Sequence, residues 1–341
     1  MMCDVEPLWR SYDAVGFDLD GVMYRGTAVV AAAPSVIGAL RHVGVKVAFV
    51  TNNAQRTPSG VCDYLKGFDV DASPVDVVTS AQATARLMAT ALPKDAAVMC
   101  IGSTALAAEI SASGLRAVPP GPTPVEAVCV GFDPALTWAD LNEGCYAVQA
   151  GAAYYACNDD ESRPTERGIA IGMGGVLAAM ATALRGTRPI TGGKPERPLL
   201  DEARRRLDAA RPIFVGDRLD TDIAGARRAG WVSLMVLSGV HGPADVVAAA
   251  ASDRPDYLAY DVGGLLEPAR VAVQQGERWC CGDAAAWAAP DLILTFDGPC
   301  ETTSQCLDAL WAVANAAWTL ADKGCIVDAR AALDRIGLEQ H

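Results

Sequence analysis

The chain has 341 residues, of which 51% are apolar, and its formal net charge is −13. This length exceeds that of one compact core, so we expect two or three domains. The apolar content excludes a disordered protein. The acidic balance, with no lysine- or arginine-rich block, argues against nucleic acid or an anionic membrane surface as a partner.

The N-terminal stretch MMCDVEPLWRSYD carries acids and lacks the apolar segment of a secretory signal. The longest apolar stretch, 168–184, is interrupted by glycines and falls short of the roughly 18–20 residues that span a bilayer. It predicts a strand, a glycine turn and a helix. We therefore expect a cytoplasmic protein with no membrane insertion, whose cysteines are mostly reduced and buried.

Apolar runs alternate with segments of helical periodicity in the first part of the chain and again after residue 188. The expected strands are 14–18, 46–53, 213–217 and 232–237, and the clearest helices are 34–44 and 198–208. Fully apolar strands that alternate with helices indicate a parallel sheet covered on both faces. We therefore predict an α/β fold with a Rossmann-like, doubly wound parallel sheet.

A second set of strands, at 97–102, 125–133, 153–158 and 168–172, has the size of a separate α/β domain. The segment 268–341 predicts short strands, turns and an amphipathic helix at 304–322, which together form a small α+β extension. The expected domains are a discontinuous core (1–80 plus 188–267), an inserted cap (81–187) and the C-terminal extension (268–341).

Polar clusters end four apolar runs of the predicted core. They are Asp18 with Asp20, the stretch 51-TNNAQRTP-58, the stretch 192-GGKPERP-198 and the stretch 216-GDRLDTDIAGA-226. Ligands of doubly wound sheets bind beyond the carboxyl ends of the strands, so we expect these clusters to converge there.

Two carboxylates one residue apart lie on the same side of an extended chain and repel each other, which a divalent cation would relieve. Magnesium prefers oxygen ligands, commonly one or two carboxylates with waters and a substrate phosphate. We expect Asp18 and Asp217 to be its side-chain ligands and Asp222 to lie in the outer shell. Lys194 would add positive charge for a phosphate group.

The motifs DxDGV at 18–22, TNN at 51–53, GKP at 193–195 and VGDxxxTDIxGA at 215–226 together resemble the haloacid dehalogenase superfamily of aspartyl-nucleophile phosphatases. The insertion between the second and third motifs resembles the branch with a large α/β (C2-type) cap. That branch includes 4-nitrophenyl phosphate, phosphoglycolate and glycerol-phosphate phosphatases. Within it the chain most resembles actinobacterial glycerol 3-phosphate phosphatases, and the resemblance covers about residues 10–267.

The resemblance implies a role for each acidic residue. Asp18 would be the nucleophile that forms an aspartyl-phosphate. Asp20 would be the general acid and then the base, and its backbone carbonyl would be a metal ligand. Partial burial and the neighbouring carboxylate would keep Asp20 protonated at the start. Lys194 would bridge phosphate and nucleophile, and Asp217 would bind Mg²⁺.

The resemblance also implies the substrate contacts. Thr51 and the backbone amides of Asn52 and Asn53 would hold phosphate oxygens, and Asn158 would be a substrate-binding residue of the cap. The cap loop 157–168 is rich in acids, which suits hydroxyl groups better than a second carboxylate. We therefore expect a small phosphorylated metabolite, with glycerol 3-phosphate as the best candidate. Phosphoglycolate and sugar phosphates are the alternatives.

Other interpretations of these motifs stay open. The acid pair also occurs in phosphomutases, although a large cap in this place disfavours them. A non-catalytic phosphate-binding module of the receiver type also pairs acids with a threonine and a lysine. A homodimer through the cap or the extension is possible. The sequence does not decide whether His241, after the strand 232–237, contacts the substrate.

Overall fold

The computed structural model describes residues 6–165 and 167–338. The chain divides into two compact units, one formed by Met1–Val47 with Ala209–His341 and the other by Ala48–Asp208. The division into core, cap and extension that the sequence suggested remains a prediction. The two units are described in turn.

Four strands of the first unit lie side by side in a parallel sheet, paired in the order β1, β13, β14 and β15. Their bounds are β1 (Ala14–Phe17), β13 (Pro212–Gly216), β14 (Val232–Val236) and β15 (Tyr257–Ala259). Every residue of β1 and β13 is buried. This burial explains why both strands are continuous apolar runs with no polar alternation, and it confirms the parallel sheet.

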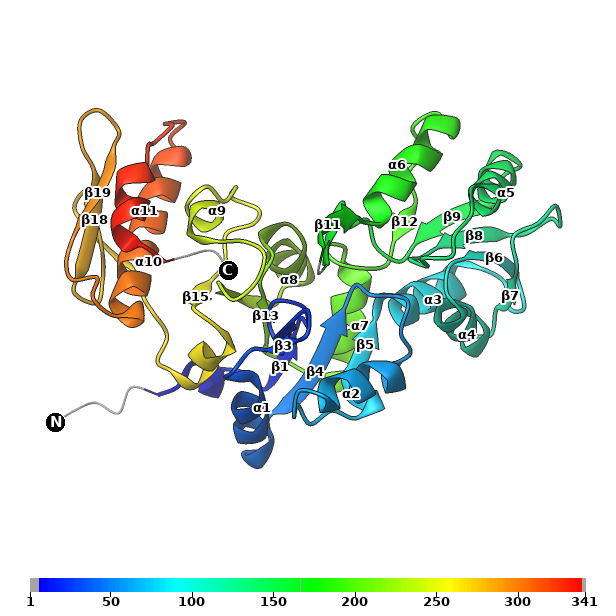
Figure 1. The fold of residues 1–341 in the computed structure, drawn as a ribbon, viewed down its shortest axis with the longest axis horizontal. Coiled ribbons are helices and arrows are strands. Elements are labelled where there is room, and N and C mark those ends of the chain that lie inside the picture. Colours follow the sequence, from blue (N-terminus) through cyan, green and yellow to red (C-terminus); the bar gives the residue numbers. More distant parts are fainter. Residues whose placement is uncertain (1–5, 166, 339–341) are drawn as a thin grey trace. The chain divides into compact units, whose positions relative to one another are not determined.

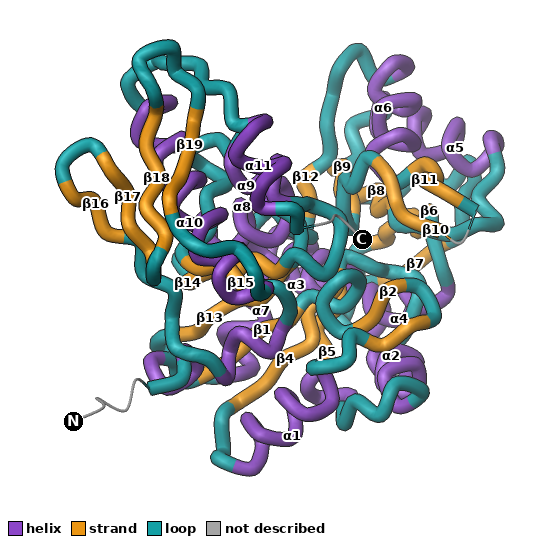
Figure 2. Tube along the Cα trace, turned by 60° about the vertical axis from the view of Figure 1, so that its left-hand side comes forward, coloured by secondary structure: helices purple, strands orange, loops and turns teal. Residues whose placement is uncertain are grey.

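Short elements connect these strands, and the hairpin β2–β3 is a separate antiparallel pair (Figure 2). The connecting elements are η1 (Leu8–Ser11), β2 (Tyr24–Arg25), β3 (Ala28–Val29), α1 (Ala33–His42), the π-type turn η3 (Leu219–Ile223), α8 (Ala224–Ala229), α9 (Pro243–Val247) and η4 (Val262–Leu266). The expected helix 34–44 is thus confirmed with a shorter C-terminal end.

The C-terminal extension is an α+β unit, as predicted. Its antiparallel sheet has the order β16 (Val273–Gln275), β17 (Arg278–Cys281), β18 (Ala284–Ala288) and β19 (Leu294–Asp297). Helices α10 (Thr303–Ala321) and α11 (Arg330–Ile336) pack against this sheet (Figure 1). Cys300 and Cys306 form a disulfide, whereas the other cysteines of residues 6–338 are free thiols.

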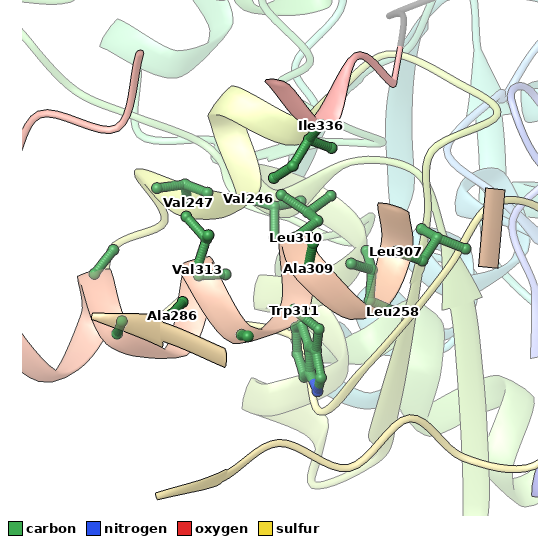
Figure 3. Close-up of a cluster of buried hydrophobic side chains, with 14 of the residues drawn as sticks. Val246, Val247, Leu258, Ala286, Leu307, Ala309, Leu310, Trp311, Val313 and Ile336 are labelled. Carbon is green, nitrogen blue, oxygen red and sulfur yellow. The ribbon is translucent and has the colours of Figure 1, made fainter. Parts of the chain in front are cut away.

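Helix α10 joins the extension to the parallel sheet of the first unit. Leu310 and Trp311 lie in one apolar cluster with Val246 of α9 and Leu258 of β15 (Figure 3). The indole Nε1 of Trp318 donates a hydrogen bond to the carbonyl of Val246 at 3.0 Å. The expected helix is confirmed, and neighbours on two sides bury most of its apolar residues.

Strand β4 (Lys46–Thr51), whose residues from Ala48 onward belong to the second unit, pairs in parallel with β5 (Val77–Thr79). A five-stranded parallel sheet follows in the same unit. The order of that sheet is β12 (Ile190–Thr191), β9 (Ala153–Ala156), β8 (Ala127–Val130), β6 (Ala97–Ile101) and β7 (Arg116–Val118). The helices are α2 (Pro58–Lys66), α3 (Ser80–Ala91), α4 (Thr104–Ala112), α5 (Trp138–Gln149), α6 (Met173–Ala183) and α7 (Arg197–Leu207), with η2 (Pro74–Asp76) before β5.

Alternate residues of the five-stranded sheet enter two separate cores. Cys100 of β6 packs in a cluster with Met88 of α3, whereas its neighbour Ile101 packs with Met180 of α6. Successive side chains of a strand point to opposite faces, so this alternation places α3 and α4 on one face and α5 and α6 on the other. The predicted inserted α/β region is a sheet covered on both sides.

One expected strand pairs differently from the rest of its set. The run 168–172 forms β11 (Gly168–Ile171), which pairs with β10 (Ser162–Thr165) in an antiparallel hairpin outside the parallel sheet. Ile169 is 77% exposed and Ile171 is 74% exposed. The apolar residues of β11 therefore do not form a buried strand. The glycine turn and helix α6 follow as predicted.

The burial of α10 predicts a large loss of stability when its core side chains are shortened. Leu310 is fully buried, so Leu310→Ala should lower the free energy of unfolding by about 3 kcal/mol. Chemical denaturation followed by circular dichroism measures this change. The control Lys323→Ala alters an exposed residue beyond the helix and should shift the value by less than about 0.5 kcal/mol. Equal effects of the two variants would contradict the packing of α10.

Candidate active site

Three carboxylates meet at the carboxyl ends of β1 and β13. Asp18 follows β1 and Asp217 follows β13, and these strands are parallel neighbours in register. Asp222 lies in the π-type turn that comes next. One carboxylate oxygen from each residue lies within 4.8 Å of the others, with Asp217 and Asp222 buried and Asp18 half-buried. The structure thus brings together the three acids that the sequence selected.

Backbone N–H groups hold two of these carboxylates. Asp222 Oδ2 accepts hydrogen bonds from the N–H groups of Asp217 and Arg218, at 3.1 and 3.0 Å. Asp217 Oδ2 accepts one from the N–H of Val240 at 2.6 Å. These hydrogen bonds fix the positions of both carboxylates relative to the backbone.

Glycine backbones press against the same carboxylates. A Cβ atom on Gly239 would collide with the carboxylate of Asp217, and one on Gly216 would collide with that of Asp222. Gly21, which comes three residues after Asp18, has φ +82° and also packs on the Asp217 carboxylate. Only residues without a side chain permit this approach, so the glycines fix the positions of the acids.

The donor set fits a hard divalent cation. Several carboxylates in one small volume repel one another unless a cation or protons intervene, and carboxylate oxygen is the donor type that Mg²⁺ prefers. Asp18 and Asp217 supply the inner oxygens most directly, because Asp222 Oδ2 is already bonded to two backbone N–H groups. The residues present could therefore hold Mg²⁺.

Asp20 differs from the expectation for it. Its side chain is exposed, so the partial burial that the sequence argument used is wrong. The turn after it is fixed by the N–H of Gly21, which donates to the carbonyl of Tyr24 at 2.7 Å. The β1 strand has ended by this point, and the chain turns outward before the hairpin β2–β3. The position leaves the carboxyl accessible to a ligand.

The predicted phosphate-binding residues lie in the second unit, where Lys194 is 1% exposed, Asn158 4% and Thr51 7%. A lysine without a function is mostly solvated, so this burial favours a functional interpretation of Lys194. Its Nζ lies 3.4 Å from the carbonyl of Val50, at the end of β4. The structure thus places Lys194 beside the TNN stretch, as the sequence predicted.

Asn52 is the centre of this second group. Its Oδ1 accepts a hydrogen bond from the N–H of Lys194 at 2.8 Å, and its Nδ2 donates to the carbonyl of Lys194 at 2.9 Å. Its own carbonyl accepts bonds from Ser80 Oγ at 2.6 Å and from Asn158 Nδ2 at 2.7 Å. The Asn52 and Asn158 side chains therefore bond to the loop backbone.

Thr51 and Asn53 shape the loop that follows β4. Thr51 Oγ1 accepts a hydrogen bond from the N–H of Asn53 at 3.1 Å, and Asn53 Oδ1 accepts one from the N–H of Gln55 at 2.8 Å. These bonds curl the chain directly after the strand. The substrate contacts assigned to Thr51, Asn52, Asn53 and Asn158 stay a prediction.

Sequence reasoning left one functional candidate undecided and missed another. His241 Nδ1 accepts a hydrogen bond from the N–H of Leu219 at 2.8 Å, and the N–H of His241 donates to the carbonyl of Asp217 at 3.2 Å. His241 therefore supports the acidic turn from the neighbouring loop. The second candidate, Asp160, accepts from Asn52 Nδ2 at 3.0 Å. Asp160 lies in an acid-rich stretch, and no sequence motif distinguished it from the neighbouring acidic residues.

Family models match the two parts of the chain that carry these motifs. "Haloacid dehalogenase-like hydrolase" matches residues 15–116, and a second model for HAD-hydrolase-like proteins matches residues 191–265. The D-glycerol 3-phosphate phosphatase of Mycobacterium tuberculosis is 38% identical over 91% of this chain and 86% of its own length. The chain belongs to the haloacid dehalogenase-like hydrolases. A 5′-nucleotidase of Bacillus subtilis is 37% identical over 68% of this chain and 89% of its own length.

Solved structures of this hydrolase family share the fold. The glycerol phosphate phosphatase of Mycobacterium tuberculosis in complex with magnesium has a TM-score of 0.84 and 35% identity, over 98% of this chain and 100% of the other. A thermostable NPPase mutant from Geobacillus stearothermophilus has a TM-score of 0.66 and 32% identity, over 73% and 96% of the two chains. The predicted fold class is confirmed. The similarity to the Mycobacterium protein includes the extension, which the sequence resemblance had left out.

The glycine packing predicts a loss of cation affinity in Gly239→Ala, because the new Cβ would displace the Asp217 carboxylate. Mg²⁺ affinity, measured by titration calorimetry, should fall about 10-fold or more, as for other disturbed ligand supports. The control is Gly38→Ala, since a Cβ there meets nothing within 4 Å and Gly38 lies in helix α1. Unchanged Mg²⁺ binding by Gly239→Ala would contradict the assignment of Asp217 as a ligand.

Proposed function

We propose that this protein is a magnesium-dependent phosphomonoester hydrolase that converts glycerol 3-phosphate to glycerol and phosphate. The observation that carries the proposal is the cluster of Asp18, Asp217 and Asp222 at the carboxyl ends of two parallel strands. Two relatives support the substrate class: the Mycobacterium D-glycerol 3-phosphate phosphatase and the glycerol-3-phosphate phosphatase of Gallus gallus, which is 35% identical over 74% of this chain and 91% of its own length.

The first half of the reaction transfers the phosphoryl group to the protein. A carboxylate oxygen of Asp18 attacks phosphorus in line, and the bond to the leaving alkoxide oxygen breaks as the new O–P bond forms. Asp20 donates its proton to that alkoxide, which leaves as glycerol. The exposed position of Asp20 gives it access to the leaving group. The products of this half-reaction are an aspartyl-phosphate at Asp18 and an ionised Asp20.

The second half hydrolyses the acyl phosphate. Asp20 removes a proton from water, the water oxygen attacks phosphorus, and the Asp18 carboxylate and inorganic phosphate are released. Mg²⁺ held by Asp18, Asp217 and the Asp20 carbonyl, with Asp222 behind them, would neutralise charge on the phosphoryl oxygens. As the family resemblance implies, Lys194 would supply a second positive charge to those oxygens. Thr51 and the backbone amides of Asn52 and Asn53 would hold the remaining ones, with the Asn53 N–H shared between the phosphate and Thr51 Oγ1.

The cap loop favours a polyol leaving group over one with a carboxylate. Arg163 of β10 lies over the ring of Phe132, with its guanidinium carbon 4.6 Å from the ring centroid, which engages the arginine in a cation–π contact. Phosphoglycolate would need such an arginine for its second acid group. Phosphoglycolate phosphatase and broad sugar-phosphate phosphatase activities remain the alternatives, and the acid sugar phosphatase of Staphylococcus aureus is 34% identical over 70% of this chain.

We also propose a cytoplasmic homodimer. In the described part of the chain, no helix has the length and hydropathy that a membrane crossing requires. The exposed isoleucines of the β10–β11 hairpin, together with Trp138 of α5 at 73% exposure, are apolar surface of the kind that interfaces cover. Light scattering on the purified chain distinguishes a dimer from a monomer.

The proposed nucleophile gives the sharpest test of activity. The wild type with Mg²⁺ should release phosphate from glycerol 3-phosphate, and Asp18→Asn should lower kcat by at least about a thousandfold, since amide oxygen is a poor nucleophile. A colourimetric phosphate assay over glycerol 3-phosphate, phosphoglycolate, sugar phosphates and 4-nitrophenyl phosphate measures both. Turnover retained in Asp18→Asn would reject the nucleophile. A wild type that binds phosphate but hydrolyses no ester would instead favour a non-catalytic binding module.

A further inference from the structure

Asp160 lies in the loop after β9, two residues beyond Asn158, and its backbone is tightly fixed. The carbonyl of Asp160 accepts a hydrogen bond from the N–H of Gly174 at 2.9 Å, and its own N–H donates to Asn158 Oδ1 at 3.3 Å. A Cβ atom on Gly172 would collide with that carbonyl. The loop therefore presents the Asp160 side chain in a defined direction, and Asn52 lies there.

The Asn52 amide connects Asp160 to the backbone of Lys194. Asn52 Nδ2 donates to Asp160 Oδ1 at 3.0 Å and to the carbonyl of Lys194 at 2.9 Å, while Asn52 Oδ1 accepts from the N–H of Lys194 at 2.8 Å. Both N–H bonds of this amide are thus used. If the amide turned over, its oxygen would face the carboxylate and the carbonyl, and its NH₂ would face an N–H donor. The arrangement accepts only one orientation.

We propose that Asp160 is a positioning residue for Lys194, to which it is connected through Asn52. The ionised carboxylate is an acceptor only, so it holds the Asn52 N–H in a charge-assisted bond. Asn52 in turn holds both backbone groups of Lys194, whose Nζ is buried at the end of β4. The inference rests on the proposed function, because it assigns Lys194 to the phosphoryl group.

The hydrogen bond between Asp160 and Asn52 connects the inserted segment to two of the sequence motifs. Asn52 and Lys194 belong to the second and third motifs, whereas Asp160 belongs to the segment inserted between them. All three lie in one compact unit. A residue of the predicted specificity loop is therefore bonded to the group that orients the lysine. We assign Asp160 this role and no contact with the leaving group.

The kinetic test compares Asp160→Ala, Asp160→Asn and Asp133→Ala on two esters, glycerol 3-phosphate and 4-nitrophenyl phosphate. Loss of positioning should lower kcat/KM of Asp160→Ala about 10- to 100-fold. The factor should be the same for both esters, because Lys194 acts on the phosphoryl group that they share. Asp160→Asn keeps an oxygen acceptor for Asn52 and should restore most of the activity.

The control Asp133→Ala removes another partly exposed carboxylate of the inserted region, whose Oδ1 accepts a local bond from the N–H of Ala135. It should leave both values of kcat/KM unchanged. Unequal factors for the two esters in Asp160→Ala would mean that Asp160 contacts the leaving group, which overturns the proposal. Unchanged kinetics, or a loss that Asp160→Asn does not restore at all, would also overturn it.

A second measurement does not depend on turnover. In ¹⁵N spectra of the full chain, Asp160→Ala should shift both the Asn52 side-chain amide and the Lys194 backbone amide, and Asp133→Ala should shift neither. A wild type that hydrolyses no ester would refute the proposed function, and these spectra would still decide the contact. Unshifted Asn52 and Lys194 signals would refute the inference while the phosphatase proposal stands.

Discussion

The repulsion among carboxylates at the ends of β1 and β13 is the constraint on which this protein's chemistry depends. Two unit charges about 4 Å apart repel by roughly 4 kcal/mol at an effective dielectric of 20. The fold offsets this cost with backbone N–H groups that donate to the carboxylates of Asp217 and Asp222. Glycines without side chains give these carboxylates room to lie close to the backbone. A site that keeps its acids together in this way is prepared for a cation.

The second unit buries a lysine and fixes its backbone. Lys194 is 1% exposed, and the amide of Asn52 bonds to its backbone on both sides. The carbonyl of Asn52 is held in turn by Ser80 at the start of α3 and by Asn158 after β9. The backbone of Lys194 is thus fixed by the Asn52 amide, and the Asn52 carbonyl is held in turn by a hydroxyl and a second amide.

Much of the acidic site could be predicted, because the carboxyl ends of parallel strands share one edge. That rule alone placed Asp18 beside Asp217, and the short turn after β13 brought in Asp222. The exposure of Asp20 could not be predicted, since it depends on where β1 stops and the chain turns. The roles of the Asn52 side chain and of His241 were hidden for a similar reason. Both side chains bond to backbone groups, and the amino-acid sequence does not show which backbone groups lie nearby.

In the fold, too, the sequence pattern predicted the elements but not how far neighbouring elements bury them. Continuous apolar runs predicted the buried parallel strands. The apolar run of β11, however, pairs with β10 in a separate hairpin, and its isoleucines are exposed. Helix α10 has a surface pattern that suggests one buried face, but α9 and β15 cover a second one. Periodicity describes what a segment can bury, and its neighbours decide how much it does bury.

The most direct test of the account is anomalous diffraction from crystals of the wild-type chain soaked in Mn²⁺, which replaces Mg²⁺ at oxygen sites. The account predicts one strong anomalous peak within about 2.3 Å of a carboxylate oxygen of both Asp18 and Asp217, with Asp222 beyond it. A peak that touches neither Asp18 nor Asp217, or no peak at a Mn²⁺ concentration that supports turnover, would contradict it.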